Sequence, residues 1–338
     1  MVAAGSLAIA GGYAWAASVQ RRAYSFRGRV VLITGGSRGL GLELARLFAA
    51  EGASIALIAR DGSELARAHN ELTGRGAHVL GISCDLRDRA QIGRTVDQIA
   101  ARLGRIDVVV NNPGIMQVGP LDHVTLDDLD EALSLHCVAP LAVVLAALPH
   151  LRRAGGGRIV NIASIGGKVA VPHMLAYTAS KFALVGLSDG LRAELHRDNI
   201  LVTTVCPGPM RTGSHLHARF KGQHRREYAW FAIADSLPVL STGSRNAARR
   251  IVRACRRGSP RLLLGLSTLA AVMLNECLPG ATGRLAAAAN LVLPGPDPAG
   301  GEHSRAGHES ESRWSRSILT TLSRRAAALN NERPVIAR

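Results

Sequence analysis

Short apolar runs bounded by glycine or polar residues recur along the chain, and the stretches between them carry apolar residues at helical spacing. Such runs are typical of buried parallel strands, and the spaced apolar residues are typical of amphipathic helices. We expect strands at Val30–Thr34, Ser54–Ala59, His78–Ser83, Ile106–Val110, Ile159–Ala163, Leu201–Cys206 and Arg261–Leu264. Strands that alternate with helices predict an α/β fold with a doubly wound parallel sheet (a Rossmann fold), which binds ligands across the carboxyl ends of its strands.

The last part of the chain has a different pattern. Ser244–Arg257 predicts a basic helix, and Leu266–Leu278 an apolar helix that is too short to span a bilayer. The apolar helix suits the core, a dimer face or an element that dips into a membrane. Residues 281–338 predict a basic, largely disordered tail, in which Ile318–Leu329 suits a small amphipathic helix on a membrane or a partner.

The N-terminal residues 1–26 form an extension of another kind, so the predicted single domain covers residues 27–280. Val2–Val19 is uncharged and rich in alanine and glycine, and arginines follow it at positions 21, 22, 27 and 29. Its length is marginal for a membrane-spanning helix. Three interpretations stay open: a membrane anchor with the body on the cytoplasmic side, a signal peptide cleaved near Ala14–Ala16, and a disordered extension.

The composition suits one large core in a reducing compartment. The chain has 338 residues, of which 47% are hydrophobic, and 36 glycines for tight strand-to-helix turns. The five cysteines are scattered and form no Cys-x-x-Cys pair, which argues against a disulfide framework and against a zinc or other metal site. We therefore expect a cytoplasmic protein, associated with a membrane if the N-terminal segment inserts.

A formal charge of +16 raises nucleic acid as a partner. However, the basic residues are almost all arginine, and the aromatic residues that could stack on bases make up only 4% of the chain. The arginines also concentrate outside the expected core, at 21–29, 245–261 and 313–325. We therefore expect no specific nucleic-acid partner, and an anionic membrane surface fits the charge better.

A glycine-rich turn, TGGSRGLG at Thr34–Gly41, follows the first expected strand. Glycines at a strand-to-helix turn let the backbone approach a pyrophosphate, and the N-terminus of the next helix supplies amide donors and a favourable dipole. The spacing Gly-x-x-x-Gly-x-Gly differs from the general Gly-x-Gly-x-x-Gly dinucleotide motif. This turn indicates a nucleotide site only in combination with other motifs.

The end of the second strand bears on which nucleotide is bound. Arg60 stands where an acidic residue would hold the ribose hydroxyls of NAD, and a basic residue there accommodates the 2′-phosphate of NADP. Arg38 in the glycine turn could reach the same phosphate, whereas Asp61 is placed to cap the next helix. We expect NADP, with NAD less favoured. Asp85, beyond the third strand, suits either an adenine contact or a helix cap.

The candidate chemistry follows the fifth expected strand. That strand leads to Ser164, and the helix after a glycine pair carries Tyr177 and Lys181 one turn apart on the same face. A neighbouring ammonium favours the phenolate, so we expect Lys181 to lower the pKa of Tyr177 and to make it a proton donor or acceptor. Ser164 could hydrogen-bond a substrate oxygen. Alone, Tyr-x-x-x-Lys would equally fit an ordinary amphipathic helix.

Together these motifs resemble the short-chain dehydrogenase/reductase family, in its NADP-preferring type. The pieces occur in the family's order between residues 27 and 274: TGGSRGLG at 34–41, CDL at 84–86, NNPG at 111–114, Ser164, Tyr177-x-x-x-Lys181 and PGPMRT at 207–212. The resemblance implies that Tyr177 is the acid/base, that Lys181 depresses its pKa and holds the nicotinamide ribose, and that Ser164 orients the substrate oxygen. It implies cofactor contacts from Gly35, Ser37, Arg38, Gly39, Leu40, Gly41, Arg60, Asp85, Leu86, Asn112, Gly114, Tyr177, Lys181, Pro207, Gly208 and Thr212.

Two positions depart from the family's pattern. Pro113 replaces an alanine, which removes a backbone donor and restricts φ. His136 stands where the family usually has an asparagine that supports a water-mediated proton relay to the lysine. Histidine can donate, accept and titrate near neutrality. Three interpretations of His136 stay open: it replaces the asparagine as a fourth catalytic residue, it slows the relay, or it has no catalytic part.

We therefore predict an NADP-dependent oxidoreductase that acts on a small-molecule alcohol, ketone or aldehyde. The resemblance places a substrate-covering lid at about residues 209–243, where a polar, basic stretch gives way to an apolar one. Because the lid and the C-terminal segments are apolar in part, we expect an apolar substrate, and a homo-oligomer is compatible with the sequence. The alternative is a non-catalytic nucleotide-binding scaffold or sensor, motivated by Pro113 and His136.

Overall fold

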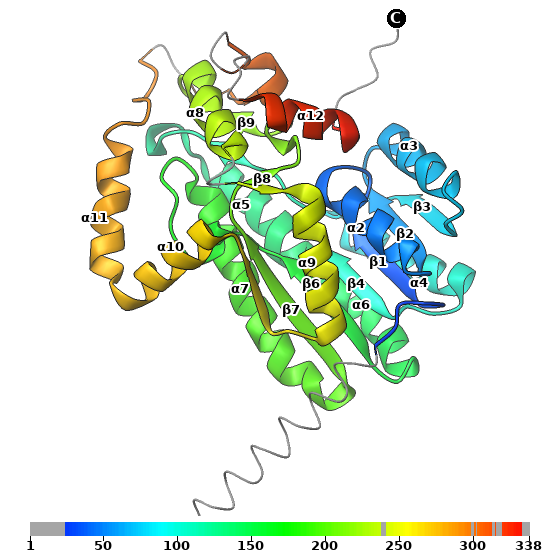
Figure 1. The fold of residues 1–338 in the computed structure, drawn as a ribbon. Helices are drawn as coiled ribbons and strands as arrows, with labels where there is room; N and C mark the ends of the chain where they lie inside the picture. The colour runs from blue at the N-terminus through cyan, green and yellow to red at the C-terminus, as the bar shows by residue number, and fades with distance from the viewer. Residues whose placement is uncertain are drawn as a thin grey trace, which may run out of the picture.

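The computed structural model describes residues 24–237, 241–298, 301, 303–312, 315 and 320–332. A parallel seven-stranded sheet in the order β11-β7-β6-β4-β1-β2-β3 forms its centre (Figure 1). The order reverses between β1 and β4, which is the switch point where a doubly wound sheet binds its ligands. The strands are β1 Val30–Thr34, β2 Ser54–Ala59, β3 Val79–Ser83, β4 Val108–Asn111, β6 Gly157–Ile162, β7 Ile200–Pro207 and β11 Arg261–Leu264.

Helices cover both faces of this sheet. One layer contains α2 Gly39–Ala50, α3 Gly62–Thr73 and α9 Ser244–Arg257, and the other contains α4 Arg89–Leu103, α6 Ala139–Arg153 and α7 Leu175–Leu195. The apolar residues of the central strands alternate between the two layers, so each strand is buried on both sides. The doubly wound α/β fold predicted from the alternating pattern is confirmed, and the observed strands lie within two residues of those expected.

One helical run among the described residues, Leu126–Arg153, is long and apolar enough to cross a membrane by length and composition. It consists of α5 Leu126–Leu133, a π-helical turn at Ser134–Val138, and α6. Val143, Val144, Ala147 and Leu151 of α6 are buried in the core against the sheet, whereas Leu145 is exposed. The run is therefore a core helix of the Rossmann fold.

The packed body begins before residue 27, the boundary expected from the sequence. Phe26 is buried, with its ring centroid 4.9 Å from that of Phe48 on α2. The guanidinium of Arg158 lies over the ring of Tyr24, 4.0 Å from its centroid. The apolar segment Val2–Val19, with its three open interpretations, lies outside the described residues.

Two small sheets and helix α8 lie beyond the carboxyl ends of the central strands (Figure 1). β8 Met210–Arg211 pairs with β10 Thr242–Gly243, and a second small sheet joins β5 Gln117–Val118, β9 Arg219–Phe220 and β12 Arg305–Ala306. Helix α8 His224–Ser236 packs on β8 and β9. The segment expected to cover the substrate therefore contains α8 and lies at the sheet edge that binds ligands.

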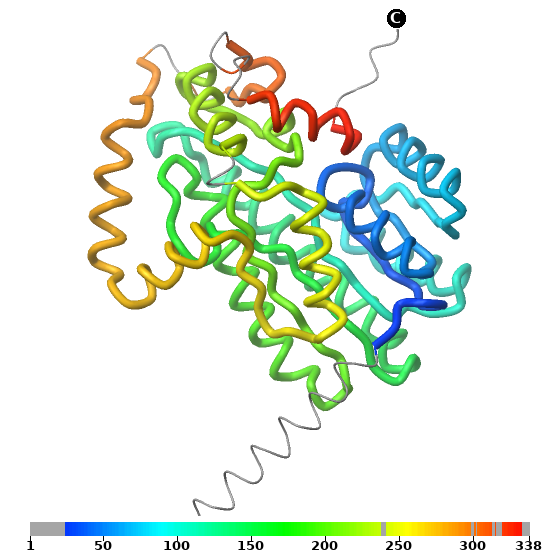
Figure 2. Tube along the Cα trace, viewed as in Figure 1, coloured from blue at the N-terminus to red at the C-terminus, as the bar shows by residue number. Residues whose placement is uncertain are grey.

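The described part of the C-terminal tail differs from the largely disordered segment that we expected. Helix α10 Leu266–Cys277 is followed by α11 Pro279–Asn290, and helix α12 Thr321–Leu329 packs on α8 (Figure 2). The small side chain of Ala327, which is fully buried, also lets α12 approach Gly213 closely. Composition predicted disorder since the tail has few large apolar residues, whereas α12 agrees with the expected amphipathic helix.

Candidate active site

Ser164 lies at the carboxyl end of β6, at the middle of the sheet edge. It caps a short 3-10 helix, and its Oγ accepts a hydrogen bond from the amide of Gly166 at 3.0 Å. The glycine pair is required by the approach of α7. A Cβ on Gly166 would lie 3.1 Å from the Tyr177 ring, and one on Gly167 would lie 2.6 Å from the carbonyl oxygen of Lys181. The glycines therefore bring Ser164 next to α7.

Tyr177 and Lys181 share one face of α7, as their spacing predicted. The Nζ of Lys181 donates a hydrogen bond to the carbonyl oxygen of Ile162 at 3.0 Å and lies 5.7 Å from the centroid of the Tyr177 ring. Lys181 is 4% exposed. The fold thus brings together all three residues of the predicted proton-handling group.

Burial dominates the titration of this pair. It raises the pKa of Tyr177 to about 12, against a smaller lowering by a hydrogen bond with Ser164. It lowers the pKa of Lys181 to about 7. The expected lowering of the Tyr177 pKa is therefore wrong for this arrangement, because the cost of desolvating the phenolate is the largest cause of its shift. Tyr177 holds its proton at neutral pH.

His136 lies on the π-helical turn between α5 and α6 and is fully buried. Its Nε2 accepts a hydrogen bond from the amide of Ile115 at 3.1 Å, which assigns the proton to Nδ1, and Nδ1 lies 2.8 Å from the Oγ of Ser180. The ring stands edge-on to that of Tyr177, with the centroids 5.5 Å apart. Burial, the largest cause, holds the pKa of His136 well below its usual value. His136 is therefore neutral, with both ring nitrogens engaged.

The NNPG motif connects β4 to the glycine turn. The amide of Asn112 donates to the Oγ1 of Thr34, and its Nδ2 donates to the carbonyl oxygen of Gly35, both at 3.1 Å. Neither bond uses the backbone N–H that proline lacks at position 113. The departure at Pro113 therefore leaves the connection between the two motifs intact.

The glycine turn fits the pyrophosphate of a dinucleotide. Gly35 has a φ of +60°, and a Cβ on it would lie 2.7 Å from the carbonyl oxygen of Asn112. A Cβ on Gly41 would lie 2.1 Å from the carbonyl oxygen of Gly35. Side chains are thus excluded at Gly35 and Gly41, and the first turn of α2 also carries no acidic residue. The amide donors of the helix N-terminus are suited to bind a phosphate.

The predicted selectivity residues lie around the same turn. Asp61 caps α3 by accepting from the amide of Glu64 at 2.8 Å, which confirms its expected role as a cap. Arg38 forms an ion pair with Glu64 at 2.9 Å, and Arg60 is exposed at the end of β2. Asp85 pairs with an arginine two residues on, and the cap of α4 is Asp88 instead, so a helix cap is not the role of Asp85.

The remaining predicted cofactor residues follow the sheet edge. Gly208 comes after β7, and a Cβ there would lie 2.2 Å from the Oγ1 of Thr268. Thr212 is buried, and its Oγ1 lies 2.9 Å from the Oγ of Ser214. Of the others, Leu40 and Leu86 are buried in the two helix-facing cores, Pro207 ends β7, Ser37 is buried in the glycine turn, and Gly114 is exposed at the end of the NNPG motif.

Three residues that reach this site were not predicted from the sequence. Asn330, Asn331 and Glu332 follow α12 and contact the glycine turn: the amide of Gly39 donates to the carbonyl oxygen of Asn330 at 2.8 Å. Asn331 Nδ2 donates to the carbonyl oxygen of Ser37 at 2.8 Å. No spacing relative to the dinucleotide motifs marks these residues, so only the folded chain could reveal them.

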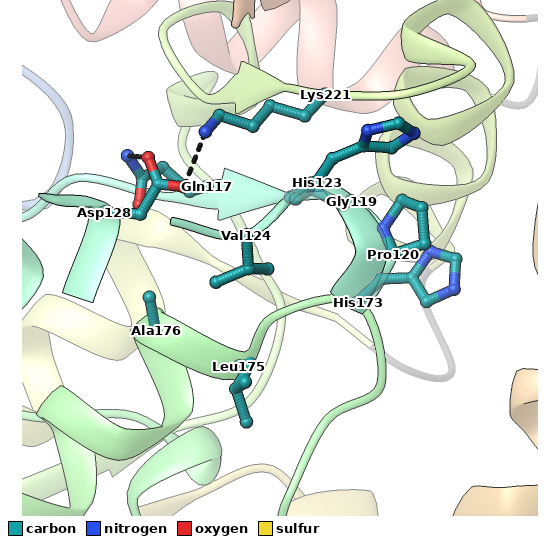
Figure 3. A pocket seen from close by; sticks show the side chains of 11 residues that line it. Gln117, Gly119, Pro120, His123, Val124, Asp128, His173, Leu175, Ala176 and Lys221 are labelled. Carbon is teal, nitrogen blue, oxygen red and sulfur yellow. Dashed lines mark hydrogen bonds and ion pairs between the residues drawn. The ribbon is translucent and has the colours of Figure 1, made fainter. Parts of the chain in front are cut away.

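A small pocket lies beside the N-terminus of α7 (Figure 3). At its edge the Nζ of Lys221 and the Oδ2 of Asp128 form an ion pair at 2.6 Å, and Gln117 donates to the other carboxylate oxygen at 2.9 Å. Ser164, Tyr177 and Lys181 do not line this pocket. The pocket is therefore distinct from the candidate catalytic group, and its Lys221 and Asp128 are paired with each other.

Residues 29–220, more than half of the chain, match the family described as short chain dehydrogenase. A "Dehydrogenase/reductase SDR family protein 7-like" of Anopheles gambiae is 39% identical over 204 residues, covering 59% of this chain. The chain spans 64% of that relative's own length. Ketoacyl reductase HetN of Nostoc sp. is 36% identical over 193 residues, covering 57% of this chain and 67% of that protein.

Solved structures show the same fold in complex with nicotinamide cofactors. L-Sorbose reductase of Gluconobacter frateurii, complexed with NADPH and L-sorbose, matches with a TM-score of 0.65 and 25% identity, over 71% of this chain and 96% of that one. A metagenomic short-chain oxidoreductase in complex with NADP matches with a TM-score of 0.58 and 27% identity, over 72% of this chain and 97% of that one.

Proposed function

The chain belongs to the short-chain dehydrogenase family, and on that premise we propose that it transfers a hydride between NADP(H) and the alcohol/carbonyl pair of an apolar small molecule. Membership of the family makes it an NAD(P)-dependent oxidoreductase that acts on CH–OH or carbonyl groups. The observation that carries the finer proposal is the convergence of Ser164, Tyr177 and Lys181 at the sheet edge that also holds the glycine turn.

Tyr177 is the proton donor when a carbonyl is reduced. The bound cofactor supplies the hydride that adds to the carbonyl carbon. The Tyr177 hydroxyl gives its proton to the carbonyl oxygen, and the electron pair of the broken O–H bond stays on the phenolate. Ser164 donates a hydrogen bond to the same oxygen and holds it within reach. In the oxidising direction, the phenolate of Tyr177 takes the proton of the substrate hydroxyl.

Lys181 stabilises the phenolate that this step creates. A phenolate in a buried site is unstable unless a positive charge lies close by. The Nζ of Lys181, 5.7 Å from the Tyr177 ring centroid, is the cation placed to supply it. Burial lowers the pKa of Lys181 to about 7, so its proton is exchangeable near neutrality.

His136 is a positioning residue in this proposal. Its Nε2 is the acceptor of the Ile115 amide and its Nδ1 pairs with Ser180, so protonating Nε2 would break a buried hydrogen bond. Ser180 in turn donates to the carbonyl oxygen of Tyr177 at 2.8 Å, which links the His136 ring to the backbone of α7. Pro140 lacks the backbone N–H that would donate a helical hydrogen bond to the carbonyl oxygen of His136, four residues earlier in the chain.

The surroundings of Tyr177 favour an apolar substrate. Tyr177 packs in a cluster with partly buried apolar residues from the lid and from the loops beside it: Met116, Val171, Trp230 and Phe231. Partly exposed side chains of this kind offer an apolar wall that a ligand can cover. The relatives act on different substrates by their names, a ketoacyl group and L-sorbose among them, so the cluster is the stronger argument for this chain.

Two arginines support NADP over NAD. Arg38 lies in the glycine turn and Arg60 at the end of β2, and no carboxylate of β2 itself stands where ribose hydroxyls would be held. The solved structures with NADPH and NADP bound agree with this preference.

The proposal is tested by following NADPH consumption with a panel of apolar ketones and aldehydes, alongside NADPH binding. We expect turnover with at least one of them and its loss in Tyr177→Phe, with binding retained. Turnover that survives Tyr177→Phe would overturn the assigned chemistry. Tight NADPH binding without turnover would favour the non-catalytic scaffold that Pro113 and His136 suggested.

Membrane association through Val2–Val19 stays a prediction. The exposed apolar side chains of α10 and α11, such as Leu266 on α10 and Leu285 on α11, are compatible with it. Fractionation of cells that express the full chain and a chain beginning at residue 24 would test it, and equal partition of both chains into the soluble fraction would contradict it.

A further inference from the structure

The C-terminal segment that follows α12 lies on the glycine turn at the start of α2. Helix α12 passes between α8 and this turn (red in Figures 1 and 2). It is held to α8 by a hydrogen bond of 2.8 Å between the hydroxyls of Ser236 and Ser323, and its Ala327 packs on Gly213. The residues after it, Asn330–Glu332, are thereby delivered to the proposed phosphate site.

The segment uses polar groups that a cofactor would need. The amide of Gly39, at the N-terminus of α2, donates to the carbonyl oxygen of Asn330 at 2.8 Å. The Nδ2 of Asn330 donates to the carbonyl oxygen of Thr212 at 3.2 Å. Gly39 and Thr212 are both cofactor contacts implied by the family. The segment therefore joins the phosphate end of the proposed site to its nicotinamide end.

The carboxyl group of Glu332 occupies the anion position of the turn. A Cβ on Gly39 would lie 2.6 Å from its Oε1, and its Oε2 lies 3.5 Å from the Nε of Arg38 and 3.3 Å from the Nε2 of His217. The Glu332 side chain is 3% exposed. A carboxyl group at a helix N-terminus beside an arginine places its oxygens where a phosphate would bind.

The contact of Glu332 with the glycine turn leaves part of its carboxyl group without a hydrogen bond. The Oε2 of Glu332 is buried and accepts no hydrogen bond. Because the loss of water around this oxygen is not fully compensated, the docked state is less stable than a fully hydrogen-bonded one. Burial raises the pKa of Glu332 to about 8, with the nearby Glu64 and Asp235 adding to the rise and Arg38 opposing it. A phosphate that satisfies the same donors more fully can displace such a group.

We propose that Asn330–Glu332 is an internal ligand of the cofactor's phosphate site, and that it must leave before NADP(H) binds. The proposal rests on the proposed function, because it assigns a regulator to the same site. An enzyme whose docked state predominates has an apparent cofactor affinity that is reduced by the fraction of undocked molecules.

The test compares NADPH affinity, measured by fluorescence titration, in the full chain and in a chain that ends at Leu329. We expect the shortened chain to bind NADPH more tightly, by roughly tenfold for a segment docked about 90% of the time. Glu332→Ala should shift the affinity in the same direction by less. The control Arg325→Ala, on the exposed face of α12, should leave it unchanged.

A second measurement follows the segment itself. Hydrogen exchange at residues 321–332 of the full chain should become faster when NADPH is added, because the segment leaves the site. Slower exchange would overturn the proposal, since the segment would then close over the cofactor. Equal affinities of the two chains would overturn it as well. If neither chain binds NADPH, the proposed function fails, and the inference that rests on it fails too.

Discussion

The two ends of the proposed cofactor site are built in different ways. At the Tyr177 end, the chemistry comes from one continuous stretch, in which the Gly166–Gly167 pair lets Ser164 approach α7. At the phosphate end, the glycine turn near the start of the chain is shared with Asn330–Glu332 near its end. The comparison teaches that the first end is fixed by close backbone packing, whereas the second is held by exchangeable polar contacts.

The largest effect expected at the Tyr177 end is that of Tyr177→Phe. Loss of the acid/base should lower kcat by roughly a hundredfold to ten-thousandfold, because general acid–base catalysis contributes about that much. NADPH affinity should stay within a few-fold, since the phosphate end is untouched. Steady-state kinetics and fluorescence titration check both numbers. A parallel loss of affinity would show that the two ends are not independent.

At the phosphate end, Arg60→Asp should shift the preference from NADP toward NAD. Losing a charge-assisted contact to the 2′-phosphate and gaining a carboxylate for the ribose should change the ratio of the two affinities by roughly tenfold to a hundredfold. Titrations with both nucleotides measure the ratio. Arg94→Asp, on the exposed face of α4, is the matched control. An unchanged ratio in Arg60→Asp would refute its assigned role.

His136→Asn separates positioning from proton transfer at the Tyr177 end. The shorter amide cannot reach both Ile115 and Ser180, so the free energy of unfolding should fall by about 1–3 kcal/mol for a buried polar group left unpaired. The rate should change by less than about tenfold, and the pH–rate profile should keep its shape because His136 is neutral throughout. A loss as large as that of Tyr177→Phe would make the imidazole a participant in proton transfer.

The smallest expected effect is the pH dependence of docking at the phosphate end. The pKa of Glu332 is about 8 when docked, and its reference value is 4.5, so docking takes up a proton between these values. Docking is therefore strongest below pH 4.5 and weakens as the pH rises through 8. His217, whose pKa burial lowers to about 4, stays neutral over this range, and the charged groups that face Glu332 are Arg38, Glu64 and Asp235.

The chain that ends at Leu329 should bind NADPH more tightly than the full chain at pH 6. This difference in affinity should be a few-fold smaller at pH 8. NADPH titrations of both chains at each pH measure this difference. The ratio of the two affinities removes the effect of ionisable groups that both chains contain. A ratio that grows with pH would contradict the prediction that docking weakens when the Glu332 carboxyl group loses its proton.

Much of the Tyr177 end could be predicted from the sequence. The strand before Ser164, the glycine pair and the helical spacing of Tyr177 and Lys181 are local patterns, and the fold places them together as expected. The direction of the Tyr177 pKa shift could not be predicted, because it depends on how completely the packed lid and core exclude water. The same holds for His136, whose tautomer is set by Ile115.

By itself, the sequence determined the order of strands and helices, the glycine turn and the spacing of the candidate acid/base. These features depend on residues close together in the chain, and backbone sterics and hydrophobic periodicity act over that range. Only the tertiary structure decided that burial raises the pKa of Tyr177, and that Glu332 lies against Gly39. Both outcomes depend on contacts between distant segments, whose energies arise only once the core has excluded water.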